Sequence, residues 1–262
     1  MASDLGETLF ERVGRTMTLT KAGEALIPYV EQVLLSVEQL RSFRQTAADY
    51  RGDIRVGVGE TLLCYRIPPV IQTFNRQAPK ARLFLQSMSC GAIRDALLDG
   101  RLDCGLFYEE VGGLGTASLN LLPMGRYPAV LVASPRTKAR YPDFVTENQH
   151  IPLPLVAGEA SCLFRQTIEG YLKQKSIRLD HTIELVSVPT IKRLVESDLG
   201  VALLPRFAVQ AELDSGALVE LETGLGRPIF SAVCACHKNK WVSPLMRLWM
   251  ELCQAQLHAE NS

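Results

Sequence analysis

Apolar residues between positions 26 and 40 recur alternately four and three residues apart. This spacing has the 3.5-residue period of a coiled-coil seam and predicts a long amphipathic helix. Such a helix either pairs with a second chain or packs on its own domain, and we favour pairing because long helices with this seam usually have a partner chain. The seam residues are Leu26, Val30, Val33, Val37 and Leu40.

The ends of this helix are also indicated by the sequence. Thr20 is a suitable N-cap, because its hydroxyl can accept a hydrogen bond from a backbone N–H of the first helical turn. The pattern fades at Arg44, and Tyr50-Arg51-Gly52 ends it. We therefore expect a helix over residues 20–50. At about 1.5 Å per residue, such a helix is about 45 Å long.

The segment before the helix is short and loop-like, and it contains a motif. Residues 9–23 read LFERVGRTMTLTKAG, with Arg12 and Arg15 upstream of the string Leu-Thr-x-Ala-Gly. This stretch resembles the junction between the winged helix-turn-helix and the linker helix of LysR-type transcriptional regulators. The resemblance implies that residues 1–19 are a remnant of that domain, its wing, and that residues 20–50 are a linker and dimerisation helix. It also implies that Arg12 and Arg15 contact the DNA backbone in a full-length regulator.

The same resemblance predicts an incomplete DNA-binding region. In this family the recognition helix lies upstream of the motif, whereas here the chain begins at Met1. Base edges in the major groove are read by that helix. We therefore expect a truncated regulator that binds DNA only when the missing helix-turn-helix is present.

The composition indicates that most of the chain does something other than hold nucleic acid. The 262 residues contain 28 Lys and Arg and 28 Asp and Glu, so the formal net charge is zero. A free-standing nucleic-acid binder usually carries a basic surface. No window is apolar for long enough to span a bilayer, and the first residues lack a signal-peptide core. We expect a cytoplasmic protein without a membrane partner.

The seven cysteines are scattered along the chain, which does not suggest a disulfide framework. We expect most of them to be reduced and buried. Cys234-Ala235-Cys236-His237 is the cluster that most suggests a metal site. Alternate residues of a strand face opposite sides, however, so the three candidate ligands cannot easily converge. The sequence therefore predicts no metal and no other cofactor.

Strands and helices alternate from residue 54 onward. The first strands are predicted over residues 54–58, 82–86 and 104–107, and helices over residues 65–76 and 90–99 separate them. This order is typical of an α/β fold with a parallel sheet and helices on its faces. Further strands are predicted over residues 129–133, 153–156, 182–186, 201–204 and 229–237. Further helices are predicted over residues 162–175, 189–197, 206–211 and 243–258. Irregular segments are predicted over residues 111–122 and 135–150.

From Arg55 to about Leu257 the chain is similar to the effector-binding domain of LysR-type regulators. The matching strings are RDALLDGRLD, IKRLV and GVALLP, at residues 94–103, 191–195 and 200–205. The resemblance implies an α/β, two-lobed, type 2 periplasmic-binding-protein-like effector domain, preceded by a long linker helix and a winged-helix remnant.

In that fold the chain crosses between the lobes twice. We expect the crossings near Gly125-Arg126 and near Arg227-Pro228. The effector-binding domain is then residues 52–262, with lobe I about 52–125 plus 229–262 and lobe II about 126–228.

A ligand is expected in the crevice between the lobes, beyond the carboxyl ends of the strands. Helix N-termini there offer free N–H groups and a partial positive charge, so a carboxylate is a natural guest. The sequence has hydroxyls and thiols at these strand-to-helix turns, although each of them could simply cap its own helix. Phe107 and Tyr108 form either an apolar wall of the site or part of the core. The predicted effector-binding residues, several of which match positions that touch effector in the resembled family, are Thr61, Ser89, Cys90, Phe107, Ser161, Cys162 and Thr190.

Cys90 and Cys162 give an alternative hypothesis. A thiol at a helix N-terminus tends to have a lowered pKa. Cys162 in the string SCLFRQ resembles the sensing cysteine of the peroxide-responsive branch of the family, but Tyr171 stands where that branch has its resolving cysteine. Redox sensing through Cys162 or Cys90 therefore remains an alternative to effector sensing.

The sequence as a whole predicts a truncated LysR-type regulator that senses a small anionic, carboxylate-containing metabolite and forms a homodimer or homotetramer. A solute-binding protein of a transporter shares the fold, but it requires export. An enzyme on the same scaffold is a third alternative. Gly57-Val58-Gly59 resembles the start of a dinucleotide fingerprint that lacks its third glycine. We predict no catalytic residues.

Overall fold

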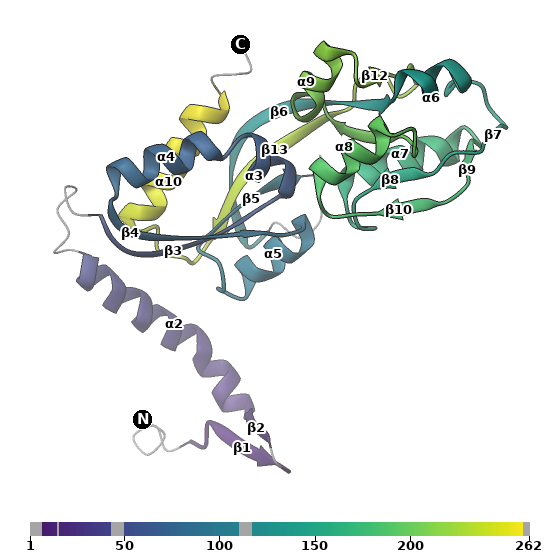
Figure 1. Ribbon diagram of the computed structural model, residues 1–262. Coiled ribbons are helices and arrows are strands. Elements are labelled where there is room, and N and C mark those ends of the chain that lie inside the picture. The colour runs from purple at the N-terminus through teal and green to yellow at the C-terminus, as the bar shows by residue number, and fades with distance from the viewer. Residues whose placement is uncertain (1–6, 15, 43–49, 110–116, 259–262) are drawn as a thin grey trace. The chain divides into compact units, whose positions relative to one another are not determined.

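The computed structural model describes residues 7–14, 16–42, 50–109 and 117–258 (Figure 1). The chain divides into two compact units, one comprising Met1–Asp49 with Lys240–Pro244 and the other Tyr50–Asn239 with Leu245–Ser262. The predictions for Arg15, for the helix beyond residue 42 and for residues 111–116 lie outside the described residues. The prediction of an irregular segment up to residue 122 is wrong for residues 119–122, which belong to a strand.

The described residues of the first unit form an antiparallel hairpin and one helix. Strand β1 (Phe10–Val13) pairs with β2 (Thr16–Leu19), and helix α2 (Lys21–Ser42) follows directly. The prediction of a loop-like segment before the helix is therefore wrong. Gly14 between the strands has a φ of 65°, a left-handed conformation that glycine adopts without strain and that permits a tight turn.

The junction between hairpin and helix explains the Leu-Thr-x-Ala-Gly string. The Thr20 hydroxyl accepts a hydrogen bond from the Gly23 N–H at 3.0 Å, which confirms Thr20 as the N-cap of α2. The same hydroxyl donates to the Thr8 carbonyl at 2.6 Å. A Cβ atom on Gly23 would collide with the Leu9 carbonyl oxygen and lie 2.9 Å from Cδ2 of Leu19. The helix can approach the hairpin this closely only because residue 23 is glycine.

The predicted apolar seam lies on α2. Leu26 and Val30 are half-buried, whereas Val33 is 62% exposed and Val37 is 39% exposed. Leu34, beside the seam, is 59% exposed. Over its described residues, this helix therefore carries several exposed apolar side chains.

The second unit begins with parallel strands, as the sequence predicts. Strand β3 (Arg51–Val58) pairs in parallel with β4 (Lys80–Ser87) on one side and with β5 (Cys104–Glu109) on the other. Because parallel strands share one direction, their carboxyl ends lie at the same edge of the sheet.

The helices that join these strands differ from the prediction at one point. A single helix over residues 65–76 is wrong, because Pro68 and Pro69 open a new helix and lack the N–H groups needed to continue the preceding one. The helices are α3 (Glu60–Tyr65), α4 (Pro68–Gln77) and α5 (Cys90–Leu98).

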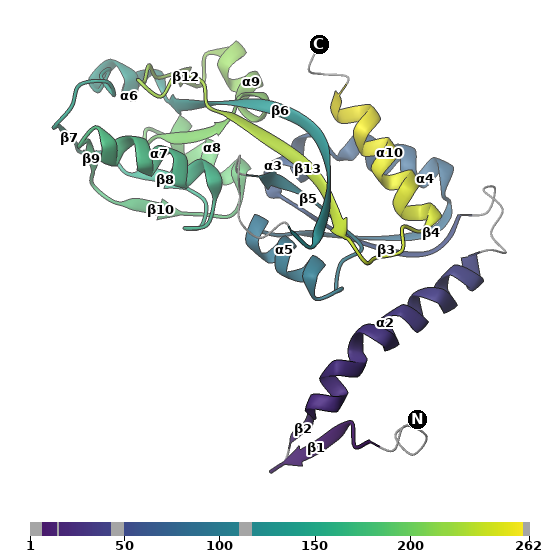
Figure 2. The same ribbon diagram turned by 180° about the vertical axis from the view of Figure 1, so that it is seen from behind.

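Two long strands run side by side through the second unit. β6 (Leu119–Ala133) and β13 (Ile229–His237) are antiparallel partners, and both views show them together (Figures 1 and 2). Their register shifts between Ala232 and Val233, at the level of Gly125. This bulge coincides with the predicted first crossing between lobes, while the lobe boundaries themselves stay a prediction.

The strands of the second unit form one main sheet. Among the described residues it has seven strands in the order β11-β6-β13-β5-β3-β4, with β12 also paired to β6. Two short parallel pairs, β8 with β10 and β7 with β9, lie outside this sheet. The strands not yet delimited are β7 (His150–Ile151), β8 (Leu155–Ala157), β9 (Arg178–Leu179), β10 (Thr182–Glu184), β11 (Ala202–Pro205) and β12 (Val219–Glu220).

The segment that the sequence predicts to be irregular over residues 135–150 contains a helix. Ser134 accepts a hydrogen bond from the Thr137 N–H at 3.0 Å, so a serine N-cap followed by Pro135 starts this helix. The helices after β6 are α6 (Pro135–Arg140), α7 (Leu163–Gln174), α8 (Val188–Glu196), α9 (Arg206–Ser215) and α10 (Pro244–His258).

Buried apolar clusters form in both halves of the second unit. One includes Ile93 of α5 and Phe107 of β5, and the other includes Val132 of β6 and Ile191 of α8. Helix α10 lies beside α4 in both views, and the rings of Phe74 and Trp249 meet edge-on at 5.7 Å (Figures 1 and 2). Within the described ranges, no helix combines the length and the apolar character needed to cross a membrane.

Candidate functional site

A cavity of about 430 Å³ opens where β3, β4 and β5 end. Its lining comes from both halves of the second unit, with Thr61 and Tyr108 from the first half and Val156 and Phe164 from the second. Cavities of this size accommodate small organic ligands. The location agrees with the rule that open α/β sheets bind ligands beyond the carboxyl ends of their strands.

Four of the described helices begin at this cavity. The first residues of α3, α5, α7 and α8 all line it, namely Glu60, Cys90, Leu163 and Val188. In α7 the first helical hydrogen bond runs from the Gln166 N–H to the Cys162 carbonyl, so the preceding N–H groups are not used within the helix. Helix N-termini also carry a partial positive charge. This part of the wall therefore favours an anionic group.

Two buried hydroxyls lie in the cavity wall. Thr61 is 6% exposed and Tyr108 is 4% exposed, and the Thr61 hydroxyl donates to the Tyr108 oxygen at 3.3 Å. Each hydroxyl has one proton, so this bond uses one of two. The second proton has no acceptor among the described residues. Burial raises the pKa of Tyr108, so its phenol stays protonated at neutral pH and remains a donor.

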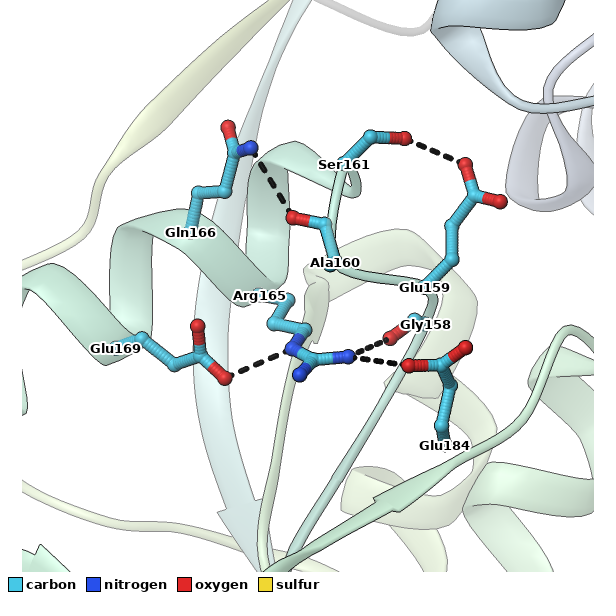
Figure 3. A network of polar contacts seen from close by, with 8 residues as sticks. All are labelled: Gly158, Glu159, Ala160, Ser161, Arg165, Gln166, Glu169 and Glu184. Atoms are coloured by element: carbon cyan, nitrogen blue, oxygen red, sulfur yellow. Dashed lines mark hydrogen bonds and ion pairs between the residues drawn. The ribbon is translucent and has the colours of Figure 1, made fainter.

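The charge of Arg165 in the wall is already balanced. Its Nε lies 2.7 Å from Oε1 of Glu169, and its Nη1 lies 2.7 Å from Oε2 of Glu184 (Figure 3). Nη1 also donates to the Gly158 carbonyl at 3.1 Å. The Arg165 side chain is 15% exposed. Two carboxylates on one partly buried guanidinium leave little positive charge for a ligand.

Glu60 and Glu159 contribute negative charge to the same wall. The Ser87 hydroxyl donates to Oε2 of Glu60 at 2.5 Å, and the Ser161 hydroxyl donates to Oε1 of Glu159 at 2.6 Å. Among the described residues, neither carboxylate pairs with a lysine, arginine or histidine. The cavity therefore combines donors at helix N-termini with two uncompensated carboxylates.

The rest of the wall is apolar. The rings of Tyr108 and Phe164 meet edge-on at 5.0 Å, and Ile168, Val186 and Leu204 line the cavity as well. A ligand with an apolar body is stabilised by removing that surface from water here.

Comparison with known proteins identifies the family. The family model described as the LysR substrate binding domain matches residues 47–258. YfiE, an uncharacterized HTH-type transcriptional regulator of Escherichia coli (strain K12), is 42% identical over 243 residues, which are 93% of this chain and 81% of that protein. This chain belongs to the LysR family of transcriptional regulators. It is thus a LysR-type regulator with an effector-binding domain, from a family of regulators rather than of enzymes.

More distant relatives and solved structures agree with this assignment. YwqM, an uncharacterized HTH-type transcriptional regulator of Bacillus subtilis (strain 168), is 27% identical over 96% of this chain and 85% of its own length. A full-length OxyR variant from Pseudomonas aeruginosa has a TM-score of 0.66 at 22% identity and covers 98% of this chain and 82% of its own. The regulatory domain of HypT from Salmonella typhimurium has a TM-score of 0.65 at 17% identity and covers 82% of this chain and 100% of its own. These structures confirm the two-lobed fold.

The structure brings part of the predicted site of this LysR-type regulator together. Ser89 lines the cavity and also caps α5, accepting from the Ala92 N–H at 3.3 Å, so its capping role and its place in the wall coexist. Thr61 caps no helix, since α3 begins after Gly59. The predicted residues that line the cavity are Thr61, Ser89, Cys90 and Cys162, and those that do not are Phe107, Ser161 and Thr190.

Phe107 lies in the core, which is the second of the two roles predicted for it. Strand β5 continues to Glu109, and Phe107, which is 1% exposed, packs with Ile93 and Leu97 under α5. Successive residues of a strand point to opposite faces, so the next residue, Tyr108, faces the cavity instead.

Ser161 and Thr190 lie at the predicted turns without lining the cavity. Both are exposed. The Ser161 hydroxyl binds Glu159, and the Thr190 hydroxyl donates to Oγ of Ser187, the N-cap of α8, at 3.0 Å. Neither residue is part of the cavity lining, although Glu159, the partner of Ser161, is.

The lowered pKa expected for the two helix-terminal thiols is also wrong. Burial raises the pKa of Cys90 and of Cys162. In Cys162 the N–H groups of Arg165 and Phe164 oppose this effect, but burial is the larger influence. Both thiols are therefore less reactive than ordinary cysteines at neutral pH.

Sequence reasoning did not single out Glu60 or Arg165. Glu60 falls in the region between a predicted strand and a predicted helix, and the short α3 that positions it was missed. The usable signal is a glycine followed by an acidic residue, which is common at a helix start. Arg165 could not be assigned, since its partners Glu169 and Glu184 come from different elements.

Other candidate chemistry has structural explanations. A Cβ atom on Gly57 would lie 2.6 Å from Cδ1 of Leu102, so close packing explains this glycine without a dinucleotide. Cys234 and Cys236 are buried in β13, and all seven cysteines, each in the described part of the chain, are free thiols. Arg12 lies exposed on β1.

Proposed function

We propose that this LysR-type regulator senses a small carboxylate-containing metabolite in the cavity of about 430 Å³. One observation carries the proposal: the N-termini of α5, α7 and α8 meet in one wall next to the buried pair of Thr61 and Tyr108. These groups are hydrogen-bond donors in a partly desolvated place, where a carboxylate is bound more strongly than at an exposed surface.

Binding would act through the relative arrangement of the lobes, which we propose to be about 52–125 with 229–262 and about 126–228. A ligand that touches both walls stabilises the arrangement in which both are within reach. The equilibrium between arrangements then shifts, and with it the geometry of the assembly. The segment over residues 1–19 and the linker over residues 20–50 would carry this change to DNA, where Arg12 contacts the phosphate backbone.

We further propose that α2 joins copies of the regulator into a homodimer or homotetramer. The support is the exposed apolar side chains of Val33, Leu34 and Val37. Val33→Lys is expected to shift the chain to monomer in analytical ultracentrifugation, because a charge would be buried in the interface. Gln32→Lys, which adds the same charge next to the seam, is the matched control and should leave the assembly intact.

The ligand proposal is tested by thermal unfolding against a panel of small carboxylates. A ligand present at about 100 times its Kd stabilises the folded state by about 2.7 kcal/mol, which raises Tm measurably. Thr61→Val should abolish most of that increase, while Thr73→Val, on α4 and outside the cavity, should not. If no carboxylate raises Tm, or if Thr61→Val and Ser89→Ala leave the increase unchanged, the proposed site is wrong.

A regulator works where the chromosome lies, so we propose a cytoplasmic location. The alternative of an exported solute-binding protein would not use a DNA-directed motif such as residues 9–23. Turnover of a bound ligand would argue for an enzyme instead.

Redox sensing is the second candidate, since Cys90 and Cys162 line one cavity. Their raised pKa values count against it. Under the effector proposal, hydrogen peroxide should oxidise Cys162 no faster than Cys64, as read by mass spectrometry of the peptides. Selective oxidation of Cys162 would favour the redox candidate.

A further inference from the structure

The polar groups of the cavity are of two opposite kinds, and this restricts the ligand more than the volume does. N–H groups at helix starts and hydroxyl protons attract negative charge. The carboxylates of Glu60 and Glu159 attract positive charge. A ligand that carries only one sign of charge leaves one of these sets unmatched.

The donor set is incomplete without a ligand. The Thr61–Tyr108 pair is more than nine-tenths buried and has a hydroxyl proton with no acceptor among the described residues. Buried donors in native proteins usually have an acceptor. The first-turn N–H groups of α7 lie in the same wall, ahead of the bond from Gln166 to Cys162. A ligand carboxylate would supply acceptors to both.

Two carboxylates of the wall, by contrast, lack a partner of positive charge in the described part of the chain. Glu60 and Glu159 each accept a hydroxyl hydrogen bond but have no cationic partner within the described residues. Arg165, the cation of the lining, is held by Glu169 and Glu184 (Figure 3). It is therefore not available to neutralise either carboxylate. A monoanionic ligand would meet both of these negative charges, which disfavours its binding.

Apolar side chains occupy the space around these polar groups. They come from elements of the second half of the second unit. The part of a ligand that lies against them therefore contacts apolar side chains. They are Val156, Ile168, Val186, Val188, Ile191 and Leu204.

We propose that the effector of this regulator is an α-amino acid with an apolar side chain. Its carboxylate accepts from the buried hydroxyl pair and the helix N–H groups, its ammonium group binds Glu60 or Glu159, and its side chain packs on the apolar wall. This inference rests on the proposed function, because it names the chemical class that the same cavity binds.

A matched ligand series tests the charge requirement on the unaltered full chain. L-Leucine is compared with isocaproate, which lacks the amine, and isoamylamine, which lacks the carboxylate. L-Phenylalanine is compared in the same way with hydrocinnamate and phenethylamine. In isothermal titration calorimetry, at least one amino acid is expected to bind about tenfold or more tightly than both of its analogues, since each analogue loses a charged hydrogen bond.

Two charge-removing variants test the assignment of the ammonium site. Glu159→Gln and Glu60→Gln keep the size and the acceptor oxygen of the side chain. At least one of these variants is expected to bind the amino acid about tenfold more weakly. The same variant should bind the matched acid with unchanged or higher affinity. Glu251→Gln, on the exposed face of α10 and outside the cavity, is the control and should change neither affinity.

The possible outcomes separate this inference from the proposed function. If an acid without an amine binds as tightly as the amino acid, the amino-acid proposal is overturned while a carboxylate effector still stands. If an amine alone binds most tightly, both proposals fail. If no member of either series binds, the amino-acid proposal is overturned, and the thermal panel of carboxylates decides the proposed function separately.

Discussion

Strand β5 separates two regions, a closed apolar core on one face and a cavity on the other. On one face Phe107 packs under α5, which lies so close that Gly57 and Gly105 have no room for a Cβ atom. On the other face the next residue, Tyr108, borders an open cavity. Both side chains are almost completely buried.

The difference shows that burial alone does not distinguish a core from a binding site. The face under α5 is closed by apolar contacts alone, whereas the cavity face keeps an unused hydroxyl proton at Thr61 and Tyr108. Substitutions on the first face should therefore change stability, and substitutions on the second should change binding.

The largest effect is expected at Phe107. Phe107→Ala should lower the free energy of unfolding by about 3–5 kcal/mol, because a large buried ring is replaced by a cavity. Urea denaturation followed by circular dichroism measures this change. A loss below about 1 kcal/mol would mean that the face under α5 is less tightly packed than the contacts indicate.

A smaller loss is expected at Gly105. An added Cβ would collide with Cγ2 of Ile93 and lie 2.9 Å from Cδ1 of Leu97. Gly105→Ala should lower the free energy of unfolding by about 1–3 kcal/mol, the usual range for overpacking. Gly91→Ala is the control. Gly91 lies in the first turn of α5, and nothing lies within 4 Å of the added Cβ atom, so this variant should not destabilise the chain.

Tyr108→Phe should separate the two faces most clearly. It removes one hydroxyl and keeps the ring, so the free energy of unfolding should change by no more than about 1 kcal/mol. Binding of any carboxylate ligand should nevertheless weaken, as measured by calorimetry. Unchanged binding together with a large loss of stability would place Tyr108 with the core instead.

The smallest effect is expected at the thiol of Cys64. This thiol donates a hydrogen bond at 3.5 Å to Oε1 of Glu60, which lines the cavity. Burial, and after it the Glu60 carboxylate, raises the pKa of Cys64 to about 11. Because a raised thiol pKa leaves little thiolate at neutral pH, alkylation of Cys64 by iodoacetamide should be slow at pH 8 and accelerate toward pH 11. Glu60→Gln should speed alkylation at pH 8, and an unchanged rate would show that Glu60 does not act on this thiol.

Strand β13 and helix α10 were predictable from the sequence, whereas only residues 129–133 of β6 were. The strand over Ile229–His237 has the predicted bounds, and the helix Pro244–His258 differs from its prediction by one residue. Each has a periodic pattern several residues long. Strands of two residues, such as β7, carry no such pattern and exist only because a partner strand lies beside them.

The candidate site was predictable in position but only partly in chemistry. Thr61 and Cys162 follow from the rule that ligands bind at strand ends, which needs only the order of elements. The choice between Phe107 and Tyr108 depended on where β5 ends. The raised pKa values of the cavity thiols and the neutralised charge of Arg165 depend on burial and on residues distant in the sequence, which no local pattern encodes.

The junction at Thr20 and Gly23 has a mechanical consequence. Because the capping bond and the close approach fasten the hairpin directly to α2, there is no flexible joint between them. Helix α2 has 22 residues, which at about 1.5 Å per residue makes an arm of about 33 Å. Tilting this arm by about 10° about its far end displaces the hairpin by about 6 Å. Because Gly23 lets the helix pack against the Leu9 carbonyl, the hairpin moves rigidly with α2. A small change in the angle of α2 therefore moves the hairpin by more than the rise of one helical turn.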